Sequence, residues 1–532
     1  MKPPLEVLGL YRAHAYTLHD AYSTRAARGP RRAWMVAGGK TWSWEEFGAA
    51  FDALARSLAA RGIRKGDRVG VLGRNSSGHV LMLFALSRIG AIMVPVNPEF
   101  GVEEACYVLH NAEVSAVAAS GECMDTARAA CAGLAPAPWL VLLDGSDADT
   151  ARLDDLVAHP PQSGVAAEVS GDDTCLIIYT SGTTGFPKGA MHSQRSFVMA
   201  GEAFVERIHL EDDDRVMIVL PLFHMNALFY SVAGTLAAGC SMVIVSRFSA
   251  ATFWQTALES GATEVNMIEA IGTILMNRPR SEFRRGHRLR KLYGARQNMV
   301  EVFRREFGVP HLVGGFGMTE IPGVTSTPFE ETAKWTGVGP IARHPDPARP
   351  WAEARVVDEE GREVGVNEVG ELVVKTPIIM QGYFRDPEQT RAAFRDGWFL
   401  TGDLVRRDAE GCFHFVSRKK DIIRRRGENI AGAELDRVIG SHPAVHEAAA
   451  IPVPSELGED EILVAVVLRP GQIASAEDIA QWCRERLAPM KVPRYVLFMD
   501  SLPHTPTHKV QKTALREDQT LKGRAIDLQA NA

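Results

Sequence analysis

The chain has 532 residues, of which 46% are hydrophobic and 23% are charged, close to the composition of an average globular protein. This length predicts about three or four domains, and the composition excludes disordered, collagen-like and coiled-coil proteins. With 59 Lys and Arg residues against 65 Asp and Glu residues, the net charge of −6 does not favour a nucleic-acid-binding protein.

The seven cysteines are scattered and include no Cys-x-x-Cys pair. We therefore expect free thiols in a reducing compartment rather than disulfides or a zinc site. The first residues lead into no apolar run of signal-peptide length, so the expected location is the cytoplasm.

One stretch, between Arg215 and Arg247, carries no charged residue apart from the titratable His224 and is long enough to span a bilayer. Prolines, glycines and polar residues interrupt it. We therefore expect a strand, a loop, a buried helix and a buried strand of a parallel sheet, with no stable membrane insertion.

In chain order, the first third alternates helical patterns with short apolar runs. Helices are expected over Trp44–Arg61 and Val80–Ile89, and strands over Val69–Leu72 and Ala91–Val96. This alternation is typical of a layered α/β fold. The acidic, proline-containing residues 144–173 are expected to form a surface connection.

Beyond residue 330 the pattern changes to short strands separated by turn residues. Strands are expected over Trp351–Val357, Glu371–Lys375 and Cys412–Val416, which indicates a β-rich subdomain. After a basic segment, an α+β domain of about 110 residues is expected. Its predicted elements are helix Ala433–Ile439, strands Glu447–Ile451 and Ile462–Leu468, helix Ala476–Leu487 and strand Val496–Met499.

The sharpest local feature is the sequence Tyr-Thr-Ser-Gly-Thr-Thr-Gly-Phe-Pro-Lys-Gly over residues 179–189, directly after an apolar strand. Glycines let backbone N–H groups approach an anion, hydroxyls donate further hydrogen bonds, and the lysine adds a positive charge. The loop is not a Walker loop, because Pro187 precedes the lysine. The candidate phosphate ligands are Thr180, Ser181, Gly182, Thr183, Thr184, Gly185 and Lys188.

This loop resembles the phosphate loop of the adenylate-forming superfamily, which contains acyl-CoA synthetases, peptide-synthetase adenylation domains and luciferases. The resemblance implies a large N-terminal domain, residues 1–417, of two α/β lobes and a β subdomain, and a small mobile α+β C-terminal lid, residues 418–532. Further motifs of the superfamily follow in order: Leu220–His224, Gly315–Glu320, Gly370–Leu372, Gly397–Asp403, Arg418–Ile423 and Leu502–Lys512.

The resemblance assigns the catalytic roles. Lys509 is the expected catalytic residue, because a lysine that stays charged stabilises the negative charge growing between a carboxylate and the α-phosphate. Glu320 is the expected magnesium ligand, together with Thr180, and Thr319 is expected to bond the α-phosphate. His224 is similar to the gate of the acyl pocket.

Other candidates bind the nucleotide or coenzyme A. Phe316 replaces the tyrosine commoner in the family and is expected to stack on adenine. Asp403, expected in a turn after Trp398 and Phe399, is expected to accept both ribose hydroxyls. His508 stands where the family usually has glycine, beside the catalytic lysine. The remaining candidates are Gly315 and Gly317 around the stacking ring, Arg418 as a second ribose contact, Gly427 at the pantetheine channel and Lys420 as the hinge.

The implied activity is an acid–thiol ligase that uses ATP, Mg²⁺ and coenzyme A. A carboxylic acid becomes an acyl-adenylate and then an acyl-CoA thioester, releasing pyrophosphate and AMP, and a role in fatty acid metabolism is expected. The chain is most similar to the crotonobetaine/carnitine–CoA ligase type over Arg247–Trp254, His287–Arg290 and Arg425–Ile430. The expected partners are a small carboxylic acid, ATP and coenzyme A, with no nucleic acid.

Two alternatives remain open: a free-standing adenylation enzyme that loads a carrier protein, and a non-catalytic protein that binds nucleotides or acyl-CoA. Lys509, Glu320 and Asp403 are all present, which favours an active enzyme. Two further hypotheses are that basic residues within 278–291 contact coenzyme A, and that Glu269 attracts a cationic acyl tail. The sequence identifies neither the acid nor the oligomeric state.

Overall fold

The computed structural model describes residues 1–532 except 10–13, 146, 148–149, 163–166, 181–186, 330–336, 349–350, 426–427, 456–459, 505–509 and 530–532, and it also leaves undescribed the side chains of residues 428 and 429. The described chain forms two compact units. The first unit comprises residues from 1–180, 187–353 and 374–398, and the second comprises residues from 354–373 and 399–532. The sequence predicts a domain boundary after residue 417, between two parts that move relative to each other. That boundary stays a prediction.

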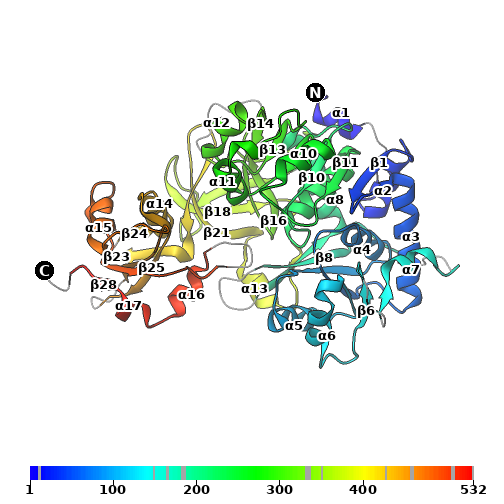
Figure 1. Ribbon diagram of the computed structural model, residues 1–532, viewed down its shortest axis with the longest axis horizontal. Helices are drawn as coiled ribbons and strands as arrows, with labels where there is room; N and C mark the ends of the chain where they lie inside the picture. The colour runs from blue at the N-terminus through cyan, green and yellow to red at the C-terminus, as the bar shows by residue number, and fades with distance from the viewer. Residues whose placement is uncertain are drawn as a thin grey trace. The chain divides into compact units, whose positions relative to one another are not determined.

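The first unit contains an eight-stranded sheet with the order β19-β9-β8-β4-β3-β5-β6-β7. Strands β8, β4, β3, β5, β6 and β7 run parallel, and β9 and β19 add an antiparallel edge. The central strands are continuous apolar runs buried on both faces, as parallel sheets require. Figure 1 shows helix α4 on one side of β8 and helices α5 and α6 on the other. Their bounds are β3 Arg68–Leu72, β4 Ile92–Val96, β5 Ala116–Ala119, β6 Trp139–Leu142, β7 Ala151–Arg152, β8 Thr174–Thr180, β9 Lys188–Ser193 and β19 Gly382–Tyr383.

A seven-stranded sheet in the same unit has the order β14-β13-β12-β10-β11-β1-β2 and is parallel except for the β1–β2 hairpin. A separate antiparallel hairpin follows β14 directly in the chain. The bounds are β1 Ala33–Ala37, β2 Lys40–Ser43, β10 Arg215–Ile218, β11 Ser241–Ile244, β12 Glu264–Asn266, β13 Lys291–Tyr293 and β14 His311–Val313, with β15 Gly315–Met318 and β16 Ile321–Ser326 in the hairpin.

One hydrophobic cluster includes side chains from both sheets and from the helices packed on them. Helix α3, for example, begins at a capping box in which Ser43 and Glu46 satisfy each other's backbone N–H groups, and it buries Phe47 and Phe51. The helices of this unit are α1 Pro4–Gly9, α2 Leu18–Ala26, α3 Trp44–Ala60, α4 Ser77–Arg88, α5 Val102–Asn111, α6 Met124–Cys131, α7 Leu153–Ala158, α8 Gln194–Ile208, α9 Ala233–Ala238, α10 Phe253–Ser260, α11 Glu269–Asn277, α12 Gln297–Arg305 and α13 Pro387–Ala392.

Two predictions from the sequence can be compared with the structure of this unit. The interrupted apolar stretch folds as β10, a turn, a π-helix over Asn226–Val232 that continues into α9, and β11, as expected apart from the π-helix. In the described chain no helix is long and apolar enough to cross a membrane. The surface connection expected over 144–173 instead contains β7 and α7, whose Leu153 and Leu156 are buried.

A five-stranded sheet contains β17, β18, β21 and β20, with β22 paired to β21. The second unit has the β23–β24 hairpin and a four-stranded sheet, β25-β26-β27-β28, with two hydrophobic clusters. The bounds are β17 Glu353–Val357, β18 Val369–Lys375, β20 Phe394–Arg395, β21 Trp398–Arg407, β22 Phe413–Arg418, β23 Ile422–Arg425, β24 Glu428–Ala431, β25 Val445–Pro454, β26 Asp460–Leu468, β27 Tyr495–Phe498 and β28 Ile526–Asp527, with helices α14 Gly432–Gly440, α15 Ala476–Arg484, α16 Lys512–Glu517 and α17 Leu521–Arg524.

Candidate functional site

The predicted phosphate loop connects the antiparallel strands β8 and β9. Thr180, the last residue of β8, pairs directly with Lys188, the first residue of β9. The Tyr107 hydroxyl donates to the Pro187 carbonyl at 3.1 Å, so α5 holds the base of the loop. The other predicted loop ligands lie outside the described residues: Ser181, Gly182, Thr183, Thr184 and Gly185.

The ammonium of Lys188 has two neutral neighbours. Its Nζ donates to Oε1 of Gln389 at 2.7 Å and lies 5.3 Å from the centre of the Tyr383 ring. Because neither neighbour carries a negative charge, they position the ammonium without neutralising it. Lys188 is therefore suited to bind an anion.

Glu320 lies in the turn between β15 and β16, and only 7% of its surface is exposed. The Tyr383 hydroxyl donates to its Oε1 at 2.7 Å. Burial, reinforced by this carboxylate, raises the pKa of Tyr383, so the phenol stays protonated and keeps donating. Tyr383 thus lies between Lys188 and Glu320 and connects the two predicted phosphate-site residues.

The backbone of this turn is held from two sides. The amide of Met380 donates to the Glu320 carbonyl at 2.8 Å. Nε2 of His192, on β9, lies 2.8 Å from the Thr319 carbonyl. Burial lowers the pKa of His192 to about 4, so its ring is neutral near pH 7 and Nε2–H donates this bond. Thr319 and Glu320 are thereby fixed relative to the base of the phosphate loop.

Hard oxygen donors suit Mg²⁺, and the buried Glu320 carboxylate and the Thr180 hydroxyl are donors of that kind. Elsewhere in the described chain, Glu211, Asp213 and Asp214 come close enough together to hold a metal ion. Lys291 already occupies that cluster, with Nζ 2.6 Å from Asp214. The predicted magnesium site therefore fits its residues better than this second acidic cluster does.

Strand β15 carries Phe316 between Gly315 and Gly317. A Cβ atom on Gly315 or Gly317 would lie 2.5 or 2.6 Å from a backbone atom of β16, and 2.7 Å from the hydroxyl of Tyr293 or Tyr230, respectively. These distances are too short for a methyl group. The glycines are therefore required by the close approach of β16 and of the two tyrosines.

His224, the predicted acyl gate, is half-buried in the turn that precedes the π-helix Asn226–Val232. Its amide donates to the Pro221 carbonyl at 3.0 Å, and its ring lies 4.2 Å from that of Phe223. π-helical turns occur frequently at functional sites. The single sequence carried no signal for this helix type.

The two predicted ribose ligands meet in the second unit. Asp403 pairs with Arg418 across β21 and β22, with Oδ1 of Asp403 3.5 Å from Nε of Arg418. Asp403 lies within a strand, not in the turn that its sequence suggested, and is 4% exposed. The backbone amide of Asp403 donates to Oγ1 of Thr401 at 3.1 Å.

Lys420, the predicted hinge, lies in a short 3₁₀ turn between β22 and β23. Arg516 donates to the Lys420 carbonyl at 2.8 Å and to the neighbouring Asp421 at the same distance. Burial, followed by the nearby positive charge of Arg418, lowers the pKa of Lys420 to about 8. Two predicted residues of this unit, Gly427 and Lys509, lie outside the described residues, as does His508.

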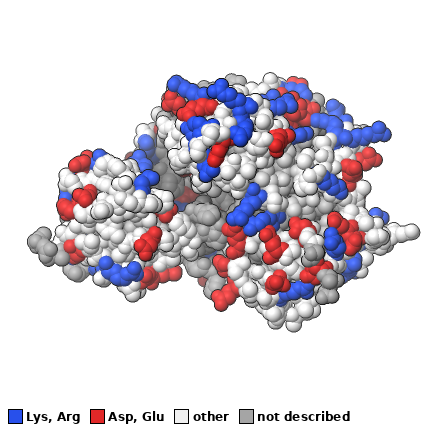
Figure 2. Space-filling view, in the orientation of Figure 1, with Lys and Arg blue, Asp and Glu red and all other residues white. Residues whose placement is uncertain are grey.

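Several basic residues within 278–291 are ion-paired or buried. Arg278 pairs with Glu282, Arg280 pairs with Glu306 at 2.7 Å, and Lys291 is fully buried. Figure 2 shows Lys and Arg side chains next to Asp and Glu side chains over α11 and α12. These three basic residues therefore have partners inside the protein, which weakens the hypothesis that the run binds coenzyme A.

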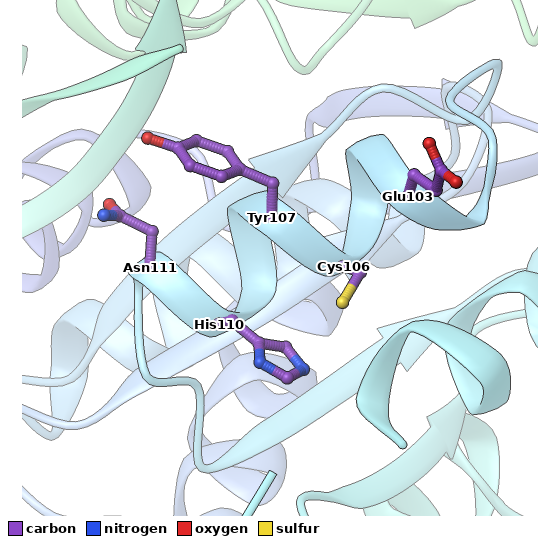
Figure 3. A pocket seen from close by; sticks show the side chains of 5 residues that line it. All are labelled: Glu103, Cys106, Tyr107, His110 and Asn111. Atoms are coloured by element: carbon purple, nitrogen blue, oxygen red, sulfur yellow. The ribbon is translucent and has the colours of Figure 1, made fainter. Parts of the chain in front are cut away.

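A surface cavity of about 490 Å³ lies along α5 (Figure 3) and contains none of the predicted site residues. Two of its residues nevertheless contact the strands around the phosphate loop. The Tyr107 hydroxyl bonds Pro187, and Asn111 accepts from the Tyr179 hydroxyl at 2.6 Å. The cavity walls therefore support the loop and do not form the candidate site. The lining residues are Glu103, Cys106, Tyr107, His110 and Asn111.

Comparison with known families gives two matches in one chain. The model described as AMP-binding enzyme matches residues 22–384, and that of the AMP-binding enzyme C-terminal domain matches residues 434–509. The chain belongs to the AMP-binding enzyme family. The resemblance and the α/β fold class predicted from the motifs, with a large N-terminal and a smaller C-terminal domain, are thereby confirmed.

Named relatives of this AMP-binding enzyme include crotonobetaine/carnitine–CoA ligases. The protein from Escherichia coli (strain ATCC 8739) is 29% identical over 502 residues, covering 89% of this chain and 93% of the relative. The protein from Shigella dysenteriae serotype 1 is 30% identical over the same shares.

Solved structures also match the AMP-binding enzyme over nearly its whole length. ATP-bound MatB from Rhodopseudomonas palustris is 29% identical, with a TM-score of 0.83 over 94% of this chain and 98% of that chain. The o-succinylbenzoate CoA synthetase MenE from Bacillus subtilis, in complex with its acyl-adenylate intermediate, is 24% identical with a TM-score of 0.80 over 93% and 98%, and supports the fold alone.

Proposed function

We propose that this AMP-binding enzyme is an ATP-dependent acyl-CoA ligase that forms an acyl-adenylate and then an acyl-CoA thioester. The observation that carries the proposal is that one chain matches the AMP-binding enzyme family and, after it, the C-terminal domain of that family. Relatives similar over 89% of the chain are named CoA ligases, which supports coenzyme A as the acceptor.

In the first half-reaction, a carboxylate oxygen attacks the α-phosphorus and pyrophosphate leaves. Lys188 and the loop that follows Thr180 hold the leaving phosphates, and Thr319 bonds the α-phosphate. Glu320 and Thr180 would hold Mg²⁺, which supplies positive charge against the phosphate oxygens. Lys509 stabilises the charge that develops as the two anions meet.

Phe316 stacks on the adenine ring, and Asp403 and Arg418 bind the ribose. For the second half-reaction, the C-terminal part from residue 418 turns about Lys420, so that Lys509 leaves and Gly427 lines the path of the pantetheine thiol. His224 gates the acyl pocket. We place the enzyme in the cytoplasm, consistent with its seven free cysteines, and its acyl-CoA product in fatty acid metabolism.

The test is acid-dependent exchange of pyrophosphate into ATP across a panel of acids, followed by thioester formation with coenzyme A. Lys509→Ala is expected to slow exchange by about 10²–10³-fold, because a charged transition-state contact is lost. The same variant is expected to keep thioester formation from a supplied acyl-adenylate. Lys522→Ala, which removes a half-buried lysine bonded to the Pro454 carbonyl, is the control and is expected to keep both activities.

Each alternative predicts a different outcome. Exchange with thioester formation on a carrier protein, but not on coenzyme A, identifies a carrier-loading enzyme. Absence of exchange with every acid identifies a non-catalytic binding protein. Equal loss of both half-reactions in Lys509→Ala contradicts the role assigned to that lysine.

A further inference from the structure

A buried positive charge lies beneath the β15–β16 hairpin. Arg207, on α8, is 3% exposed, and its Nη2 donates to the Gly323 carbonyl at 2.9 Å. Its Nε and Nη1 are buried and have no hydrogen-bond partner in the described part of the chain. No carboxylate among the described residues forms an ion pair with it, although a buried charge is costly without a partner. Nε and Nη1 are therefore buried donors without an acceptor in the described part of the chain.

Tyr230 lies next to this guanidinium, and Tyr293 packs against Tyr230. The guanidinium lies 5.5 Å from the centre of the Tyr230 ring, and the Tyr230 and Tyr293 rings meet edge-to-face at 5.1 Å. Burial, followed by the neighbouring Tyr293 phenol, raises the pKa of Tyr230, so its hydroxyl remains a donor. Arg207, Tyr230 and Tyr293, which we call the buried cation cluster, together present donors but no negative charge.

The buried cation cluster touches the hairpin that carries the predicted reaction site. A Cβ atom on Gly323 would lie 1.9 Å from Nη1 of Arg207. A Cβ atom on Gly317 or Gly315 would lie 2.7 Å from the hydroxyl of Tyr230 or Tyr293, respectively. Phe316, Thr319 and Glu320 belong to this hairpin and its turn. The cluster thus contacts the same strand, β15, that carries Phe316.

Two further observations mark the region as a ligand site. Tyr230 belongs to the π-helix that begins two residues after His224, the predicted acyl gate. Tyr293 ends β13, and ligands of parallel sheets bind at the carboxyl ends of strands. The amide oxygens of Asn226 and Asn266 are also buried without a partner in the described chain. Unpartnered polar groups therefore gather around the segment that leads from the gate.

We propose that the buried cation cluster binds an anionic group at the far end of the acyl substrate, so that the enzyme activates carboxylic acids bearing a second carboxylate. This inference rests on the proposed ligase function. A carboxylate would accept from the free N–H groups of Arg207 and from the phenols. The site we infer would repel the quaternary ammonium group of a betaine. Glu269, suggested above for a cationic tail, is more than half exposed and already lies 3.7 Å from Arg296.

The experiment compares dicarboxylic acids of three to eight carbons with their monomethyl esters in pyrophosphate exchange. At one or more chain lengths the free diacid is expected to have a kcat/KM at least about tenfold above that of its ester, because only the diacid has the second charge. Arg207→Met is expected to remove this preference by lowering kcat/KM for the diacid at least about tenfold more than kcat/KM for the ester.

Arg195→Met, on the same helix but ion-paired with Asp172 at 2.8 Å, is the matched control and is expected to keep the preference. Tyr293→Phe is a milder variant, expected to raise KM for the diacid about three- to tenfold, and it keeps the test decisive if Arg207→Met does not fold. Equal use of diacids and esters by the wild-type enzyme, or a preference for betaines, overturns the proposal. Absence of exchange with every acid instead contradicts the ligase function itself.

Discussion

Tyr383 is the residue on which the geometry of Glu320 depends. Its hydroxyl donates to Oε1 at 2.7 Å, and its ring faces Lys188. We predict that Tyr383→Phe raises the Mg²⁺ concentration needed for half-maximal exchange and lowers kcat/KM for ATP roughly tenfold, because a hydrogen bond to a charged group is worth about 1.5–3 kcal/mol. Initial rates measured across a Mg²⁺ series check this.

The matched control for this prediction is Tyr22→Phe, which removes a buried hydroxyl that donates to the Trp44 carbonyl in the core. That variant is expected to lower thermal stability and leave the Mg²⁺ dependence unchanged. Superimposable Mg²⁺ curves for wild type and Tyr383→Phe would mean that Glu320 does not need the phenol.

At the scale of single residues, the sequence predicted the motif residues but not the side chains that hydrogen-bond to them. Tyr383 is 63 residues from Glu320, and His192 is 127 residues from Thr319, so no local pattern connects them. A single sequence predicts residues within a motif by their spacing, whereas these contacts exist only because β9, β15 and β19 meet in the fold. Asp403 illustrates the same limit, since its Gly-Asp sequence suggested a turn and the sheet made it a strand residue.

The β15–β16 hairpin is the element that joins the nucleotide residues to the buried cation cluster. Gly323 has φ of +82° and no room for a side chain, because a Cβ atom would meet Arg207. We predict that Gly323→Ala destabilises the first unit by more than 2 kcal/mol, roughly, through backbone strain and crowding together, and slows exchange at least tenfold. Thermal unfolding and exchange rates measure the two effects.

Gly133→Ala, in the same unit, separates the two causes. Gly133 has a similar φ of +88°, but nothing lies within 4 Å of the position of its Cβ. This control is expected to show only the strain of about 1 kcal/mol and normal exchange. If both variants lose the same stability, crowding by Arg207 contributes nothing to the hairpin.

The bounds of elements with a clear hydrophobic period were predicted closely, whereas elements without such a period were not predicted. The helix expected over Trp44–Arg61 spans Trp44–Ala60, because its amphipathic pattern and capping box both mark it. The π-helix at Asn226–Val232 is apolar on almost every side, so no period distinguishes its winding from an α-helix. Helix α7 has only six residues and no side-chain cap, and its formation depends on burying Leu153 and Leu156.

Over the whole molecule, fold class followed from the order of elements. Alternating strands and helices predicted parallel α/β sheets, and the strand-rich run after residue 330 predicted a distinct sheet. Strand order could not be predicted in the same way. Strands β1 and β2, from the start of the chain, extend a sheet whose other strands follow residue 214, and only long-range packing decides this.

The first unit also contains two histidines, His79 and His192, whose pKa values burial lowers to about 4. The unfolded chain binds protons at these rings below a pKa of about 6.5, whereas the folded chain does not until about pH 4. Stability is therefore lost as the pH falls from 6.5 to 4, by about 2 kcal/mol for each ring at pH 5. Acid should unfold this unit before its carboxylates are fully protonated.

We predict that His79→Gln, which cannot be protonated, reduces the loss of unfolding midpoint between pH 7 and pH 5 by a few degrees relative to wild type. His79 lies on α4 at 1% exposure and has no role in the proposed reaction, so the effect reports protonation alone. Tryptophan fluorescence follows this unit, because Trp34 and Trp44 lie in its core. His159→Gln changes an exposed ring and should leave the wild-type slope intact, and an unchanged slope in His79→Gln would mean that His79 is already charged in the folded protein.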